Sequence, residues 1–137
     1  MVSGVILVDT SAWIEYLRGS DHPVTSRLTD LIERGVPLTI TEPIVMELLA
    51  GATTPRLEQS VGRLVDGLRV TPVDSLLDYR AAAQLHVASR RNGHPIRSLM
   101  DCLIAAVAIR RGIAVLHGDR DFDYLAEISP LQVHGIS

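Results

Sequence analysis

The sequence predicts an α/β fold in which a mostly parallel central sheet is covered by helices on both faces. Short apolar runs rich in β-branched residues alternate with helical segments along the whole chain. The run Val5–Asp9 is apolar up to its last residue, which is typical of a strand buried on both faces. Strands that alternate with helices are joined by right-handed crossovers, and 137 residues suit one domain with one core.

Capping residues, glycines and prolines mark the ends of the predicted elements. Thr10 or Ser11 can cap a first helix that runs to Arg18 and stops at Gly19, and Pro43 suits the first turn of another helix. The predicted strands are Val5–Asp9, Leu38–Thr41, Arg69–Val73, Ala114–His117 and Leu131–His134. The further predicted helices are Val24–Arg34, Pro43–Leu49, Arg56–Leu68, Leu76–Arg91, Ser98–Arg111 and Phe122–Ile128.

The composition excludes several classes of protein. With 47% hydrophobic and 21% charged residues, the chain is expected to fold rather than to be disordered. No apolar run approaches the roughly 20 residues that span a bilayer, and no leader precedes the first strand, so we expect a cytoplasmic protein without membrane contact. Cys102 is the only cysteine, and its apolar surroundings favour a buried thiol over a catalytic one.

The formal net charge of −3 argues against nucleic-acid binding by a broadly basic surface, because phosphates attract cations. All thirteen basic residues are nevertheless arginines, whose planar side chain suits phosphates. The negative charge is expected to gather in one pocket that a metal ion would neutralise.

Acidic residues follow several of the predicted strands. In parallel sheets of this kind, ligands bind beyond the carboxyl ends of the strands. Taken singly, each of these acids has an ordinary interpretation as a turn residue, a cap or a carboxylate facing a helix dipole. They are Asp9 after the first strand, Glu42 and Glu47 after the second, and Asp119 and Asp121 after Ala114–His117.

Asp101 is harder to explain as a structural residue. It lies in the first turn of a helix that is apolar on every face from Leu99 to Ile109, with Cys102 as the only other polar residue. A lone ionised carboxylate there costs roughly several kcal/mol unless it is paired or bound to a metal. The structural alternative is an ion pair with Arg97 or a contact with the helix dipole.

Together these carboxylates predict a site for Mg²⁺ or Mn²⁺, because both ions prefer oxygen ligands. Zinc is not expected, since the five histidines have no ligand spacing, and His117 is interpreted as a strand-end residue. Carboxylate-bound metals hydrolyse phosphodiesters by activating water and stabilising the leaving oxygen. The hydroxyls of Thr10 and Ser11 either orient the carboxylate of Asp9 or a bound water, or serve as helix caps.

Four segments resemble the PIN-domain motifs of VapC-type toxins, the ribonuclease components of bacterial type II toxin–antitoxin pairs. The resemblance covers essentially the whole chain, with the motifs in the right order, and implies a single PIN-like (Rossmann-like) domain over residues 1–137 with about five strands. The segments are VDTSAWI at 8–14, ELLAG at 47–51, RSLMDCLIA at 97–105 and HGDRDF at 117–122.

The resemblance also implies roles for individual residues. The metal-binding acids of the family fall on Asp9, Glu47, Asp101 and Asp119, with Asp121 beside them as a further catalytic carboxylate. Position after the second strand favours Glu42, whereas the family pattern falls on Glu47, so Glu42 is kept as a supporting residue. Near the rim of the site, Arg97 and Arg120 are predicted to hold RNA phosphates.

The implied activity is a Mg²⁺- or Mn²⁺-dependent endoribonuclease that cuts structured transfer or ribosomal RNA. The implied partners are a second copy of the chain and a cognate VapB-type antitoxin, in a heterotetramer or larger complex. A receiver domain is disfavoured because the chain has no lysine, and an aspartyl phosphatase because Asp9 begins no Asp-x-Asp motif. A PIN-like module that only binds RNA or a partner remains the alternative.

Overall fold

The computed structural model describes residues 4–135 and contains the predicted parallel sheet. Its four strands are ordered β3-β2-β1-β4, and all neighbouring pairs run parallel. Ile6 in the central strand pairs with Leu38 on one side and with Ala114 on the other. The strands are β1 (Ile6–Val8), β2 (Leu38–Ile40), β3 (Arg69–Val70) and β4 (Ala114–Leu116).

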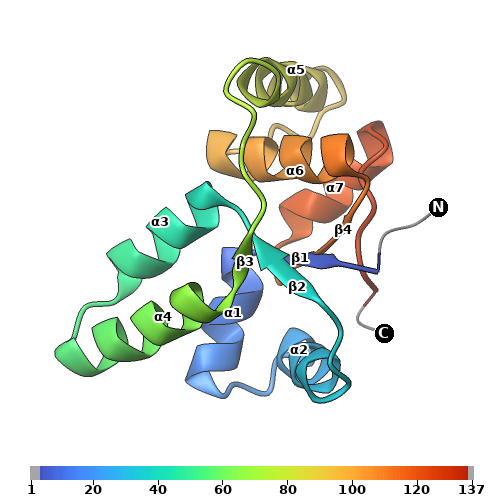
Figure 1. Ribbon diagram of the computed structural model, residues 1–137. Coiled ribbons are helices and arrows are strands. Elements are labelled where there is room, and N and C mark those ends of the chain that lie inside the picture. Colours follow the sequence, from blue (N-terminus) through green and yellow to red (C-terminus); the bar gives the residue numbers. More distant parts are fainter. Residues whose placement is uncertain (1–3, 136–137) are drawn as a thin grey trace.

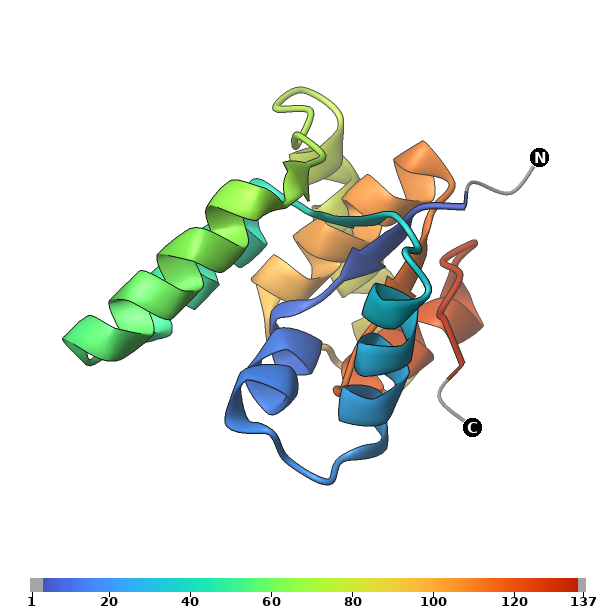
Figure 2. The ribbon, with the colours of Figure 1, turned by 60° about the horizontal axis from the view of Figure 1, so that its bottom comes forward.

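Helices lie on both sides of this sheet (Figure 1). The pair α1 and α2 lies on one side, α6 and α7 lie on the other, and α5 packs against the outer side of α6. Figure 2 shows α3 and α4 side by side, projecting from the body as an arm. The helices are α1 (Thr10–Arg18), α2 (Pro23–Glu33), α3 (Glu42–Gly51), α4 (Pro55–Gly67), α5 (Asp78–Arg91), α6 (Leu99–Arg111) and α7 (Arg120–Ile128).

Two expectations about the elements need correction. The predicted strand Leu131–His134 is reduced to one isolated parallel bridge between Val115 and Val133, so the fifth strand is vestigial. The first helix is capped by Asp9 rather than by Thr10 or Ser11, because the Asp9 side chain accepts a hydrogen bond from the Ser11 backbone N–H. A carboxylate at this N-cap is held firmly at the end of β1.

The core is aliphatic, as the composition indicates, and α6 lies at its centre. Every residue of α6 from Cys102 to Ala108 is buried, which confirms the prediction of a helix that is apolar on every face. Burial raises the pKa of the Cys102 thiol to about 11, with further contributions from Asp101 and Asp121, which is consistent with an unreactive core residue. Within residues 4–135, no helix is long and apolar enough to cross a bilayer.

Candidate active site

The order in which strands are added to the sheet reverses between β1 and β4, which run parallel, and the acidic residues gather at this point. From β1 the sheet extends through β2 to β3 on one side, whereas β4 lies on the other side. Asp9 follows β1 directly, and its backbone N–H donates to the Leu116 carbonyl at 2.9 Å. Asp119 follows β4 after two residues. Such a switch point is where sheets of this class place their ligands.

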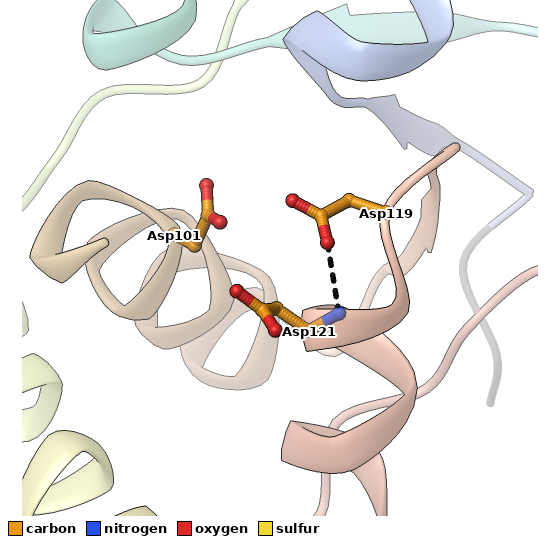
Figure 3. Close-up of side chains that lie close together, drawn as sticks. All are labelled: Asp101, Asp119 and Asp121. Atoms are coloured by element: carbon orange, nitrogen blue, oxygen red, sulfur yellow. Dashed lines mark hydrogen bonds between the residues drawn. The ribbon is translucent and has the colours of Figure 1, made fainter. Parts of the chain in front are cut away.

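Three carboxylates from two helices face one another at this edge (Figure 3). Asp101 comes from the first turn of α6, Asp119 is the N-cap of α7, and Asp121 lies in the first turn of α7. One oxygen from each lies within 4.8 Å of the others, a spacing that one cation can bridge. The Asp119 side chain also accepts a hydrogen bond from the Asp121 backbone N–H at 3.0 Å, which fixes one of its two oxygens.

Asp9 is buried beside this group with half of its carboxylate unsatisfied. The residue is 3% exposed, and Oδ2 accepts hydrogen bonds from the Ser11 hydroxyl at 2.6 Å and the Ser11 N–H at 3.0 Å. The other oxygen, Oδ1, is buried and has no hydrogen-bond partner among the described residues. Burial raises the pKa of Asp9, although the bonds from Ser11 oppose this effect. An orphaned carboxylate oxygen of this kind fits a cation ligand.

The structure distinguishes Glu47 from Glu42. Glu47 in α3 accepts a hydrogen bond from the Thr10 hydroxyl at 2.8 Å, and its pKa is raised by burial and by the charge of Asp9. Glu42 instead accepts hydrogen bonds from the Val73 N–H and the Thr41 hydroxyl. Its carboxylate therefore holds the connection after β3, and the structure does not bring Glu42 into the acidic group.

The environment of Asp101 is also unfavourable for a negative charge. Burial, followed by the charges of four other acids, raises the pKa of Asp101 to about 8. The four are Asp9, Asp119, Glu47 and Asp121. We call Asp101 and these four residues the carboxylate cluster.

Protein cations do not neutralise the carboxylate cluster. In the part of the chain that the structure describes, no ion pair involves any of its five members, so the alternative pair of Asp101 with Arg97 does not form. Arg97 is exposed and lowers the pKa of Asp121, whose net shift is nevertheless upward because burial and Asp119 act against it. Arg120, the first residue of α7, is also exposed. Arg120 is adjacent in sequence to Asp119 and Asp121, and Arg97 acts electrostatically on Asp121, whereas binding of RNA phosphates by these arginines stays a prediction.

Ser11 and His117 connect the two segments that carry Asp9 and Asp119. The Ser11 hydroxyl donates to Asp9 and accepts from the Gly118 N–H at 2.9 Å. The His117 ring, interpreted from sequence only as a strand-end residue, contacts the Asp119 backbone and the Asp123 carboxylate, both at 3.1 Å. The sequence signal for this contact is a histidine two residues before Asp119, directly after a strand. This spacing alone does not reveal that the His117 ring contacts the Asp119 backbone.

Comparison with known proteins gives consistent results over most of the chain. The PIN domain family model matches residues 6–128. The chain is 44% identical to ribonuclease VapC11 of Mycobacterium tuberculosis over 129 residues, which cover 93% of this chain and 96% of the relative.

Solved VapBC structures share the same fold. VapBC-1 from nontypeable Haemophilus influenzae matches with a TM-score of 0.73 and 16% identity over 96% of this chain and 98% of that chain. VapBC-5 from Mycobacterium tuberculosis, a member of the VapBC family of toxin–antitoxin systems, matches with a TM-score of 0.69 and 23% identity. The latter match covers 96% of this chain and 98% of that chain.

Proposed function

The chain belongs to the PIN-domain family and, within it, to the VapC ribonucleases of toxin–antitoxin systems, and on this basis we propose a metal-dependent endoribonuclease. The observation that carries the metal dependence is Asp101, a half-buried acid with four acidic neighbours and no cationic partner among the described residues. Burial and, after it, repulsion by the four acids raise the pKa of Asp101 to about 8, and a bound divalent cation would offset both effects.

We propose that the carboxylates of Asp9, Glu47, Asp101 and Asp119 hold Mg²⁺ or Mn²⁺, with Asp121 beside them. The donor set fits these ions because it consists of oxygen atoms, one of which, Asp9 Oδ1, is buried without a partner. A divalent cation bound there supplies an activated water and neutralises charge on the scissile phosphate.

The protein's own side chains prepare the site for this chemistry. Ser11 holds Asp9 and Thr10 holds Glu47, so two carboxylates are oriented by hydroxyls that lie next to Asp9 in the sequence. The hydrogen bond from the Thr10 hydroxyl at 2.8 Å restricts the orientation of the Glu47 carboxylate, which suits a metal ligand.

The substrate that we propose is structured RNA, namely transfer or ribosomal RNA cut at a single-stranded loop. Arg97 and Arg120 at the rim are suited to bind its phosphates. We expect replacement of either arginine by alanine to reduce the salt dependence of RNA binding by roughly one counterion. An unchanged salt slope in both variants would show that they do not contact phosphates.

We further propose that this chain, as a homodimer in the cytoplasm, binds a cognate VapB-type antitoxin that covers the carboxylate cluster. The support is that VapBC-5, which shares its fold, is a member of the VapBC family of toxin–antitoxin systems. The complex is expected to be a heterotetramer or larger. Co-expression with a candidate VapB-type antitoxin, followed by light scattering, measures the stoichiometry, and a monomeric toxin that binds no antitoxin contradicts this proposal.

The proposed activity is tested by incubating labelled transfer and ribosomal RNA with the purified chain and Mg²⁺. We expect cleavage that EDTA stops and that Mn²⁺ restores. The Asp9→Asn variant is expected to be inactive, whereas Glu42→Gln, an acid of the same region outside the carboxylate cluster, is expected to cleave like the wild type. RNA that is bound but uncut at enzyme excess would instead support the non-catalytic binding module.

A further inference from the structure

His117 occupies an unusual place at the end of β4. Its side chain is buried, with 8% of the residue exposed, and the ring packs against Phe122 with 5.2 Å between ring centroids. Both ring nitrogens have partners: Nδ1 lies 3.1 Å from the Asp119 backbone N, and Nε2 lies 3.1 Å from Asp123 Oδ1. A buried histidine with both nitrogens satisfied has a defined orientation.

The partners determine where the ring proton lies. The Asp119 N–H is a donor, so Nδ1 must be the unprotonated acceptor. The ring proton is therefore on Nε2, which donates to the Asp123 carboxylate. Asp123 thus selects the form of His117 that is able to accept from Asp119.

The bond from the Asp119 N–H constrains a residue whose side chain is already constrained. Asp119 Oδ1 accepts from the Asp121 N–H at 3.0 Å, and Asp119 is the N-cap of α7. The backbone of Asp119 is thereby tied to β4 through His117, and its carboxylate is tied to α7. Figure 3 shows the result, in which Asp119 and Asp121 both face Asp101.

We propose that His117 is a positioning residue of the metal site, which acts by accepting a hydrogen bond at Nδ1 from the Asp119 backbone. It touches neither substrate nor metal, and it holds Asp119 and Asp121 at the spacing that one cation needs. This inference rests on the proposed function, because it assumes that the carboxylate cluster binds a divalent metal. Partners of this kind, one step removed from the metal, typically contribute about 10–100-fold to metal affinity.

Two substitutions separate hydrogen bonding from packing. In His117→Asn, the amide oxygen can take the place of Nδ1 and accept from Asp119. In His117→Gln, the longer side chain can reach Asp123 but presents no acceptor at the Nδ1 position. The measurement is Mn²⁺ affinity of the full chain, followed by electron paramagnetic resonance of free Mn²⁺, with melting in EDTA as a check of folding.

We expect His117→Gln to weaken Mn²⁺ binding about tenfold or more and His117→Asn to remain within about threefold of the wild type. Equal losses in both variants would assign the effect to ring packing and overturn the proposal, as would unchanged affinity in His117→Gln. A wild-type chain that binds no Mn²⁺ would overturn the proposed metal dependence itself, which is a distinguishable result.

A measurement on the wild type keeps the proposal testable if a variant does not fold. Nitrogen-15 NMR of the imidazole is expected to show a proton on Nε2 and none on Nδ1, with slow exchange of the Asp119 amide. A proton on Nδ1 would exclude the hydrogen bond from Asp119 and overturn the proposal.

Discussion

Each end of α6 lies near a carboxylate that is largely withdrawn from solvent, but only one of these carboxylates has a cationic partner among the described residues. At the C-terminal end, Asp78 is 1% exposed and receives two hydrogen bonds of 2.9 Å from Arg110. Burial raises the pKa of Asp78, but the bonds from Arg110 and the Asp74 N–H outweigh it, so that the net shift is downward. At the N-terminal end, burial and acidic neighbours raise the pKa of Asp101 to about 8.

The difference shows how a structural acid and a functional acid are told apart. Burial of a charge is unfavourable at either position, and the fold compensates for it at Asp78 with a guanidinium. At Asp101 the described residues provide only further negative charge, so compensation has to come from outside the chain. Both carboxylates come from helical segments, and only their surroundings differ.

The largest expected effect is on catalysis at Asp101. Asp101→Asn is expected to lower the cleavage rate by more than the roughly 100-fold typical of losing a residue one step from a metal. Because the substitution relieves repulsion, the melting temperature in EDTA should hold or rise. Cleavage of labelled RNA with Mg²⁺ and melting followed by circular dichroism measure the two quantities. If this variant cleaves RNA at the wild-type rate, Asp101 is not a metal ligand.

Asp78→Asn is expected to have the opposite effects: a large loss of stability and little change in the cleavage rate. It leaves Arg110 without its carboxylate partner and should reduce the free energy of unfolding by about 3 kcal/mol, the lower end for a buried pair. The lower end applies because the Arg110 side chain is 28% exposed. Urea denaturation measures the loss. Below the melting range, cleavage should stay within about threefold of the wild type, and a catalytic loss as large as that of Asp101→Asn would contradict the comparison.

The smallest effect is the pH dependence of stability without metal, which has opposite signs for the two acids. Folded Asp101 keeps its proton between pH 3.8 and about 8, where the unfolded chain has lost it, so stability falls as the pH rises through this window. Asp78 contributes stability above pH 3.8, and this contribution is lost as the pH falls through its lowered folded value.

We therefore expect the metal-free wild type to be most stable at mildly acidic pH and to melt roughly 3 °C or more lower at pH 8. The matched variant Asp101→Asn should show a flatter profile over the same window. The measurement is thermal melting in EDTA from pH 4 to pH 9. Identical slopes for the wild type and Asp101→Asn would mean that Asp101 titrates normally in the folded chain.

Much of this arrangement follows from local patterns in the sequence. The lone carboxylate in an apolar helix already marked Asp101 as an acid that needs a partner, and the strand ends placed Asp9 and Asp119 at one edge. The choice between Glu42 and Glu47 was not accessible in this way. It depends on which side of α3 faces Thr10 and which faces Val73, and these contacts are 37 and 31 residues apart in sequence.

The sequence alone determined the order of strands and helices, the buried character of α6 and the identity of the acids, because periodicity and residue type act over a few neighbouring residues. The tertiary structure decided which acids lack a counter-charge, that Glu42 binds the chain after β3, and that His117 holds the backbone of Asp119. Charge pairing and burial depend on contacts between residues that are distant in sequence. They are therefore determined only when the chain has folded.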